Sequence, residues 1–425
     1  MRSIKVGLLG LGQIGSGLYK LISRKNGFFE RRYGVRFEIA RVLVKNPKKK
    51  RFAGLNQKAL TTQASRILND PSIDVVIELV GGIQPAKKLV MEALKKGKDV
   101  ITANKALLAE EGDGIFALAQ KLGRQVFFEA SVGGGIPVIK TLREGLSANR
   151  IDSILGIVNG TCNYILTQMS QQGLDFQTAL KQAQEKGYAE PDPSFDIDGV
   201  DSAHKIAVLA RLAFEQHIPF DDVYCEGIRH ITEQDVTFAK DFGYCIKLLA
   251  IAKREKNGIE ARVQPTLIPK DHILAKVDGS FNAILFGGDE VGDILLYGRG
   301  AGPEPTASAV MSDLIDYSRG IESRLPEPAG KPLKVKSISS ILSRYYLRFA
   351  VLDQPGVLSK IAGVLGKHDV SISDVIQTER KTGTVVPLIL LTHHVHEKDI
   401  RAAVCQIDGM KSMIRAKSRV IRIEA

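Results

Sequence analysis

The chain has 425 residues, of which 44% are hydrophobic and 25% charged, a balance typical of globular proteins and not of disordered or fibrous ones. No run approaches the ~20 apolar residues of a membrane span, and the four cysteines form no CxxC pair, so we expect a cytoplasmic protein with no membrane partner, disulfide framework or zinc site. The net charge of +12 comes without a basic patch interleaved with aromatic residues, so no nucleic-acid partner is expected.

The first 135 residues alternate strand and helix patterns. Apolar runs at 3–9, 37–44, 74–79, 99–102 and 125–129 predict strands, and helical periodicity at 15–25, 86–96 and 114–122 predicts helices between them. Strands that alternate with helices at this spacing form a parallel, doubly wound sheet, so we predict a Rossmann-type α/β domain.

A glycine fingerprint follows the first predicted strand and opens a helix. In this GxGxxG motif, Gly10 permits a tight turn, Gly12 lets the backbone approach a pyrophosphate, and Gly15 lets the helix pack on the strand. Gln13 and Ile14 lie between them, at the helix N-terminus that would meet the phosphates. A glycine-rich turn without a ligand is the alternative, but the strand and helix context favours dinucleotide binding.

The end of the second predicted strand bears on coenzyme choice. An NAD site would place a carboxylate there for the ribose hydroxyls, whereas this chain has Lys45, followed by Lys48, Lys49, Lys50 and Arg51. Lysine would pair with a 2′-phosphate, so we predict NADP, with NAD as the alternative. A solvated charge run is the structural alternative.

The pattern changes after the glycine run at 133–135. A strand at 154–158 and helices at 164–169, 176–185 and 201–215 predict a second, α+β domain. A second glycine-rich turn at 298–302 precedes a predicted helix at 306–318. It is expected to return the chain to the nucleotide-binding domain, with Gly302 at the coenzyme, or else to be a plain loop.

The densest polar segment is 187–205, a loop bounded by proline and glycine that leads into a helix. Asp201 is predicted to cap this helix, and Lys205, four residues on, projects from the same face. An N-cap with a surface ion pair is the alternative. His204 points in another direction on a helix and is expected to be structural.

The C-terminal part begins with a predicted linker, 321–344, rich in proline, serine and basic residues. Segments 345–353, 356–367, 370–378, 385–392, 398–406 and 412–423 then predict the order βαββαβ of a ferredoxin-like module.

These segments resemble homoserine dehydrogenases over about residues 1–320. The spacing from Ala183 through Gly187, Pro193, Asp196, Gly199 and Asp201 to Lys205 is similar to the family signature. The resemblance continues at 102–105 (TANK), 129–137 (EASVGGGIP) and 159–165 (NGTCNYI). Residues 345–425 resemble an ACT domain, an amino-acid-sensing module.

The resemblance implies interconversion of aspartate 4-semialdehyde and homoserine in threonine, methionine and isoleucine biosynthesis. It implies that Lys205 is the acid/base residue, with Lys105 beside the nicotinamide and the substrate. An alkoxide formed by hydride transfer needs a proton donor. Lysine, with a usual pKa near about 10.4, would need burial or a second cation such as Lys105 to act near neutrality.

The remaining site residues are expected on the same grounds. The substrate would contact Glu190, Asp201, Lys105, Asn159, Gly160, Thr161 and Asp196; the coenzyme would contact the fingerprint, Lys45, Val80, Gly81, Lys105, Gly187 and Gly302. The resemblance also implies a monovalent cation such as Na⁺ at Glu129, Val132, Gly134 and Ile136.

The expected domains are a dinucleotide-binding domain at 1–135, completed by about 298–320, and a domain at 136–297 that the resemblance implies to serve catalysis and dimerisation. The linker 321–344 and the ACT domain 345–425 follow, and we expect a homodimer or homotetramer. Threonine is the expected effector, with a ligand-free dimerisation module as the alternative. Two rival functions are an aspartate-semialdehyde dehydrogenase, which needs a catalytic cysteine, and a silent amino-acid sensor. Cys162 has no nearby base, and intact Lys205, Lys105, Glu190 and Asp201 argue against the sensor. No kinase-like segment precedes the first predicted strand, so we expect no fused aspartate kinase.

Overall fold

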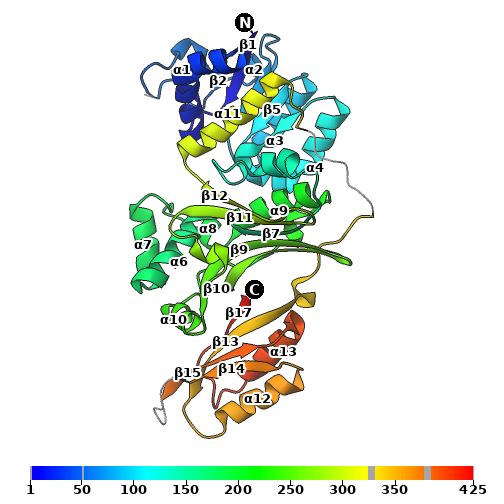
Figure 1. The fold of residues 1–425 in the computed structure, drawn as a ribbon. Helices are drawn as coiled ribbons and strands as arrows, with labels where there is room; N and C mark the ends of the chain where they lie inside the picture. Colours follow the sequence, from blue (N-terminus) through cyan, green and yellow to red (C-terminus); the bar gives the residue numbers. More distant parts are fainter. Residues whose placement is uncertain (1, 50–51, 324–330, 378–383, 425) are drawn as a thin grey trace. The chain divides into compact units, whose positions relative to one another are not determined.

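The structure is a computed structural model that describes residues 2–49, 52–323, 331–377 and 384–424 (Figure 1). The chain forms two compact units, each assembled from three segments. The first contains Met1–Ile154, His204–Asp221 and Phe281–Leu333, and the second contains Leu155–Ala203, Asp222–Ser280 and Lys334–Ala425.

The first unit is built on a parallel sheet of six strands. They are β1 (Arg2–Leu9), β2 (Val35–Leu43), β3 (Leu60–Thr61), β4 (Val75–Glu78), β5 (Asp99–Thr102) and β6 (Val126–Phe127), in the order β3-β2-β1-β4-β5-β6. Every neighbouring pair is parallel. This is the strand order of a Rossmann fold, and the prediction of a doubly wound sheet is confirmed.

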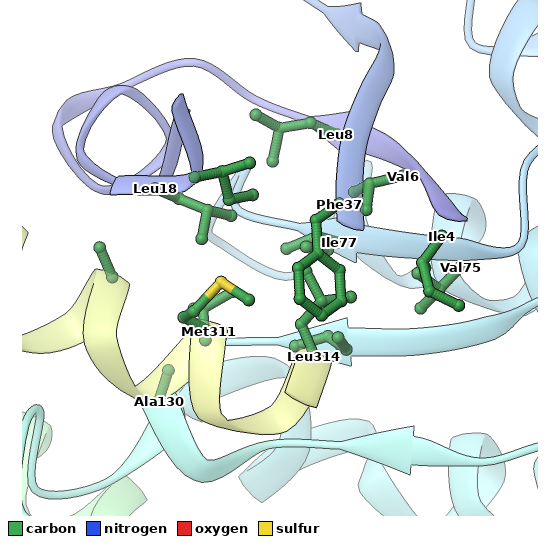
Figure 2. Packing of buried hydrophobic residues seen from close by; sticks show 14 of the residues in the cluster. Ile4, Val6, Leu8, Leu18, Phe37, Val75, Ile77, Ala130, Met311 and Leu314 are labelled. Carbon is green, nitrogen blue, oxygen red and sulfur yellow. The ribbon is translucent and has the colours of Figure 1, made fainter. Parts of the chain in front are cut away.

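Helices cover both faces of this sheet. On one face α1 (Gln13–Tyr33) and α11 (Pro303–Arg319) lie side by side, and Leu18, Met311 and Leu314 pack against Ile4 and Val6 of β1 (Figure 2). On the other face α3 (Ala86–Lys95) and α4 (Lys105–Lys121) pack on the alternate strand residues. Side chains alternate between the two faces of a strand, so each apolar run predicted as a strand contributes side chains to the hydrophobic core on both faces of the sheet.

Helix α4 begins nine residues earlier than predicted, at Lys105 rather than 114. The side chain of Asn104 caps it by accepting a hydrogen bond from the Leu107 N–H at 3.1 Å. Gly112 and Gly114 lie within the helix and disguised it in the sequence, because glycine weakens a helical pattern without ending the helix.

The chain passes from one unit to the other within β7 (Ile151–Ile157), within α9 (Val200–Phe214) and within the short 3-10 helix Phe220–Asp222. The first unit also contains the hairpin of β11 (Phe281–Gly288) and β12 (Gly292–Arg299). Sequence patterns did not predict this hairpin.

The second unit combines helices with a mixed sheet. Its helices include α6 (Gly160–Gln172), α7 (Phe176–Glu185) and α10 (Glu233–Asp241), and its longest strands are β9 (Tyr244–Glu255) and β10 (Gly258–Pro269), an antiparallel pair. The strand order is β9-β10-β17-β13-β15-β14. β17 (Arg419–Ile423) therefore lies between β10 and β13 (Leu342–Leu352), pairing parallel with the former and antiparallel with the latter.

The C-terminal module has the predicted ferredoxin-like order. β13, α12 (Val357–Lys367), β14 (Ile372–Ile376), β15 (Val385–Thr392), α13 (Glu397–Asp408) and β17 follow one another along the chain. The predicted strand at 370–378 thus ends at Ile376, and Thr378 lies outside the described residues. Part of the predicted linker, 324–330, also lies outside them.

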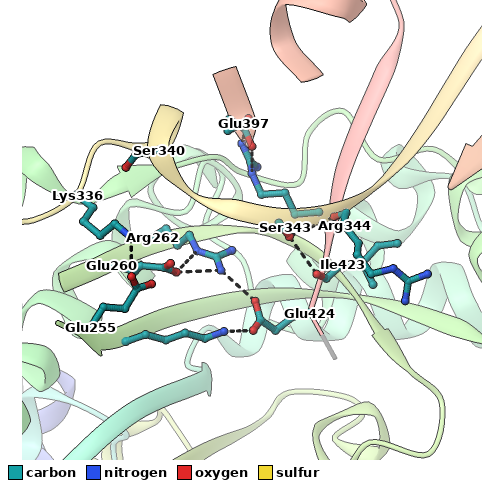
Figure 3. Close-up of polar contacts among 12 residues, drawn as sticks. Glu255, Glu260, Arg262, Lys336, Ser340, Ser343, Arg344, Glu397, Ile423 and Glu424 are labelled. Atoms are coloured by element: carbon teal, nitrogen blue, oxygen red, sulfur yellow. Dashed lines mark hydrogen bonds and ion pairs between the residues drawn. The ribbon is translucent and has the colours of Figure 1, made fainter. Parts of the chain in front are cut away.

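Polar contacts tie this module to β10. Arg262 on β10 donates to Glu424 at 3.0 Å and to Glu260 at 3.3 Å, and Lys253 on β9 pairs with Glu424 (Figure 3). Within the predicted linker, Val335 forms a parallel bridge with Ile259, and β13 already begins at Leu342. The module is therefore bound to the β9 and β10 hairpin by backbone as well as by charge.

Candidate active site

The glycine fingerprint, Gly10 to Gly15, forms the turn of the candidate dinucleotide site. Gly10 has φ +101, and a Cβ there would lie 2.6 Å from the Leu79 carbonyl oxygen. A Cβ at Gly15 would lie 2.5 Å from the Gly10 oxygen, which shows how closely α1 meets the turn. Gly12 precedes α1, and no described atom lies within 4 Å of its ideal Cβ position. The helix N-terminus thus offers open backbone, as a pyrophosphate requires.

The carboxyl ends of the neighbouring strands meet the fingerprint. Gly10 N–H donates to the Leu43 oxygen at 3.1 Å, which brings the end of β2 and exposed Lys45 to this edge. Val80 and Gly81 follow β4, and Lys105 follows β5 as the first residue of α4. Of the basic cluster, Lys50 and Arg51 lie outside the described residues.

The second glycine turn packs against the first unit's own elements. Gly302 has φ +118 and precedes α11, and a Cβ at Gly17 of α1 would lie 3.2 Å from the Pro303 oxygen. A Cβ at Gly134 would lie 2.5 Å from the Gly300 oxygen. The backbones of the glycine runs at 133–135 and 298–302 are therefore in contact, and Pro303, directly after the second run, lies close to α1.

In the second unit, one amide gathers two carboxylates. Asn159 caps α6 by accepting from the Cys162 N–H at 2.8 Å, while its Nδ2 donates to Asp196 Oδ1 at 2.7 Å and to Asp201 Oδ2 at 2.8 Å. Asp201 is only 4% exposed. The sequence prediction that Asp201 caps its helix is wrong: α9 begins at Val200, and the Asp201 carboxylate lies in the first turn and accepts from Asn159 instead.

The loop before α9 folds onto the start of α6. Thr161 Oγ1 donates to the Tyr188 oxygen at 2.6 Å, and the Cys162 thiol donates to the Asp196 oxygen at 3.2 Å. Gly160 is the first residue of α6. Gly187 has φ +73 where α7 gives way to this loop, and the exposed Glu190 accepts from Gln184 through its backbone oxygen at 3.1 Å.

Lys205 and His204 are neighbours on helix α9 but have different surroundings. Lys205 lies one turn after Asp201 and is 8% exposed. His204 Nε2 lies 2.9 Å from Glu110 Oε1 of α4, and its ring stacks on Phe220 at 4.2 Å. His204 is thus engaged with α4 and a ring, in agreement with the structural role expected for it.

Glu129 lies in a buried polar cluster. Its two carboxylate oxygens accept from the N–H groups of Ile139 at 3.0 Å and Lys140 at 2.7 Å, and Asp313 accepts from the Glu129 N–H at 2.9 Å. Burial raises the pKa of Glu129 to about 7, against these two backbone hydrogen bonds and the charge of Lys140, which lower it.

The residues around Glu129 fit a monovalent cation better than a transition metal. Among described residues no group of three His, Cys, Asp or Glu side chains gathers as a metal site. Gly133 and Gly134 have φ +76 and +56, so the chain turns tightly in the segment that contains Val132, Gly134 and Ile136. Ile136 O already accepts from the Val138 N–H at 2.8 Å. One carboxylate with carbonyl oxygens is a hard donor set.

Comparisons with known proteins bear on these sites. Residues 10–129 match the model of the homoserine dehydrogenase NAD-binding domain, 137–315 that of homoserine dehydrogenase, and 345–409 that of the ACT domain. A Pseudomonas aeruginosa homoserine dehydrogenase is 43% identical over 434 residues, covering 100% of this chain and 99% of its own length. The chain belongs to the homoserine dehydrogenase family.

Solved structures agree. The crystal structure of a homoserine dehydrogenase from Thiobacillus denitrificans has a TM-score of 0.91 and 44% identity, and covers 100% of this chain and 99% of that one. A Staphylococcus aureus homoserine dehydrogenase has a TM-score of 0.81 and 33% identity, with 100% of both chains covered. The chain is therefore an NAD(P)-dependent oxidoreductase of amino-acid biosynthesis with a C-terminal ACT domain, and the rival readings as aspartate-semialdehyde dehydrogenase or silent sensor are set aside.

No helix in the described ranges is long and apolar enough to cross a membrane. Sequence reasoning missed several buried polar residues of the first unit, chiefly Glu78, Asp313 and Asp316. The signal for Glu78 was present, since a carboxylate ends the otherwise apolar run 75–78.

Proposed function

We propose that this homoserine dehydrogenase interconverts L-aspartate 4-semialdehyde and L-homoserine with NADP, and that Lys205 is its acid/base residue. The observation that carries this proposal is the clustering of Asp196 and Asp201 on Asn159, at the first turn of the helix that presents Lys205. Residues four apart on a helix share one face, so a carboxylate and an amine point the same way.

The nicotinamide coenzyme supplies the hydride when it is bound. Lys205 donates a proton to the oxygen that becomes the hydroxyl of homoserine, and takes it back in the reverse direction. Lys205 is only 8% exposed, so little solvent water can reach its amine. Lys105, the first residue of α4, is the proposed second cation and would lie beside the substrate and the coenzyme, as the family resemblance implies.

The carboxylates would hold the substrate's ammonium group. Asp201 and Glu190 offset its charge, with Asp196 and Asn159 keeping Asp201 in place and Gly160 and Thr161 presenting the start of α6. Cys162 is 0% exposed and its thiol donates to a carbonyl, which suits packing and not nucleophilic attack. Turnover should therefore not need phosphate.

The experiment is NADPH oxidation by L-aspartate 4-semialdehyde in phosphate-free buffer, with homoserine identified as product. Formation of homoserine in equal amount to the NADPH consumed supports the proposal. Absence of NADPH oxidation, together with phosphate-dependent reduction of NADP⁺ by the semialdehyde to give an acyl phosphate, would contradict it.

NADP preference rests on Lys45, which is exposed two residues after the end of β2. We expect Lys45→Ala to lower kcat/KM for NADPH by about tenfold, with little change for NADH, because only NADPH carries the 2′-phosphate. The exposed Lys58→Ala serves as the matched control and should change neither value. A lower KM for NADH than for NADPH in the wild type would overturn the preference.

A monovalent cation is proposed at Glu129, Val132, Gly134 and Ile136. Activity in NaCl or KCl should exceed activity in choline chloride at equal ionic strength, and equal activities would remove the cation from the account.

Feedback regulation is proposed for the ACT domain, with threonine as effector. Asp353, at the junction of β13 and α12, is 9% exposed, and its Oδ2 has no hydrogen-bond partner among the described residues. An effector ammonium would pair with it, and its carboxylate would meet the N-terminus of α12 after Gly356. Threonine that altered neither activity nor thermal stability would exclude this role. The family's assembly as a homodimer or homotetramer is likewise proposed for this chain.

A further inference from the structure

We propose that Glu78 is a positioning residue for coenzyme binding: its buried carboxylate fixes the loop at 80–82 and the turn at 102–105 to each other. This inference rests on the proposed coenzyme site, in which Val80, Gly81 and Lys105 contact the coenzyme. Glu78 itself would touch neither coenzyme nor substrate.

The carboxylate of Glu78 binds two strand ends at once. Glu78 is the last residue of β4 and is 0% exposed. Its Oε1 accepts from the N–H groups of Val80 at 2.7 Å and Gly81 at 3.1 Å, and its Oε2 accepts from the hydroxyl of Thr102, the last residue of β5, at 2.6 Å. A single side chain thus joins the loop after β4 to the end of β5.

Asn104 closes the same network from the other side. Its backbone N–H donates to Thr102 Oγ1 at 3.1 Å, its Nδ2 donates to the Gly82 oxygen at 2.7 Å, and its Oδ1 caps α4 by accepting from Leu107. Loop and turn are therefore connected twice, through Glu78 and through Asn104. Lys105 follows directly as the first residue of α4, so its backbone position is set by this ring of bonds.

The loop at 80–82 needs the hydrogen bonds of Glu78 because its two glycines allow many backbone conformations. Gly81 has φ +78 and Gly82 has φ +69, and glycine adopts many other conformations at little cost. Hydrogen bonds to a carboxylate select one of them before the coenzyme arrives. Binding groups held in advance by such a supporting shell lose less entropy when the ligand binds.

Packing alone does not call for a carboxylate here. Val75, Val76 and Ile77, which precede Glu78 on β4, are each 0% exposed and apolar. A buried carboxylate is unfavourable unless it is hydrogen-bonded, so its presence at the end of this strand is explained by the three donors that it holds.

A glutamine in its place would satisfy only half of the network. If the amide oxygen faces Val80 and Gly81, the NH₂ group faces Thr102 Oγ1, which already accepts from Asn104. The Thr102 hydroxyl proton then loses its acceptor, because an amide presents a donor where the carboxylate presented an oxygen. Glu78→Gln therefore separates the two strand ends at nearly constant volume.

The experiment is a fluorescence titration of the full chain with NADPH, without substrate, alongside thermal unfolding. We expect Glu78→Gln to raise the Kd at least about tenfold and Thr102→Val about fivefold, whereas Thr102→Ser, which keeps the hydroxyl, stays within about twofold of wild type. In turnover, the KM for the coenzyme should rise more than kcat falls. A purely structural role would lower Tm and leave the Kd of the folded protein unchanged.

The outcomes separate this inference from the proposed function. Failure of the wild type to bind NADPH or NADH would sink the coenzyme site itself, and this inference with it. If the wild type binds the coenzyme, and Glu78→Gln and Thr102→Val both bind it with the wild-type Kd, the positioning role alone is overturned. If Glu78→Gln does not fold, the valine and serine variants of Thr102 decide, and equal Kd values for these two would overturn it.

Discussion

At the scale of residues, the proposed substrate site depends on the two hydrogen bonds that Asn159 donates to Asp196 and Asp201. These bonds fix the two carboxylates in a place where two negative groups would otherwise repel each other. The substrate ammonium group, which we propose pairs with Asp201, would relieve that repulsion. Charge, and not shape alone, is therefore the proposed basis for recognising an amino-acid substrate.

The variant Asp201→Asn tests whether the charge of Asp201 is needed for substrate recognition. We expect kcat/KM for homoserine to fall about a hundredfold, or about 2.7 kcal/mol, because the amide keeps the shape but loses the charge. Asp198→Asn is the matched control: Asp198 lies in the same segment, its side chain is 42% exposed, and it pairs with Arg229, so activity should stay within about threefold. Equal losses in the two variants would contradict the role of Asp201.

At the scale of elements, buried charge ties α10 to the ACT domain. Asp235 on α10 is 0% exposed and accepts from Arg348 of β13 through Nε at 2.7 Å and Nη2 at 3.1 Å, with the Tyr346 hydroxyl at 3.2 Å. Together with the pairing of β17 on β10, these bonds make the ACT domain part of the second unit. The ACT domain, the proposed effector site, is thus joined to β10 by the strand pairing of β17.

Arg348→Met should lower the free energy of unfolding by about 3–5 kcal/mol, because it leaves the Asp235 carboxylate buried without its cation. Lys336→Met is the control, since Lys336 pairs with a partly exposed Glu255 at 2.7 Å and should contribute less than about 1 kcal/mol. Urea denaturation monitored by circular dichroism measures both. Losses of similar size would show that the Asp235 pair is no stronger than a surface pair.

At the scale of the whole molecule, acid should destabilise the chain through Glu397. This carboxyl, 2% exposed, accepts from Arg422 and Arg401. Burial alone would raise the pKa of Glu397, but the charges of and hydrogen bonds from Arg422 and Arg401 outweigh it and hold the pKa below its usual value. Its contribution to stability is therefore fully present above the unfolded pKa near about 4.3 and is lost as pH falls through the lower folded pKa.

Glu397→Gln should accordingly lower Tm at pH 7 and lose less Tm than wild type between pH 5 and 3, because the variant has no carboxylate to protonate. Differential scanning fluorimetry across this range gives both slopes. Parallel slopes for the two proteins would exclude Glu397 as a source of the acid sensitivity.

Features that depend on neighbouring residues can be predicted from the sequence, whereas contacts between distant segments cannot. The Rossmann and ACT folds were predictable because strand runs, the fingerprint and βαββαβ order are local patterns. The β9 and β10 hairpin was not, since strands such as β10, buried almost throughout, lose the alternation that marks a strand. The pairing of β17 with β10 joins distant segments, and local composition does not encode it.

The site divides in the same way. The spacing from Asp201 to Lys205 was visible as a helical period, and the signature from 183 to 205 implied their roles. The bonds of Asn159 to both acids, and those of Glu78 to Thr102, bring together residues from separate elements. Sequence spacing cannot show these contacts, although the charged residue at the end of an apolar strand indicates where to look.

The most direct test of the central claim is Lys205→Ala, measured as the single-turnover rate of NADPH oxidation with L-aspartate 4-semialdehyde, alongside the Kd for NADPH. The account predicts that the rate falls by about 10²–10⁴, as for a lost general acid, while the Kd stays within about threefold of wild type. An unchanged rate with intact coenzyme binding would remove Lys205 from the chemistry and contradict the account.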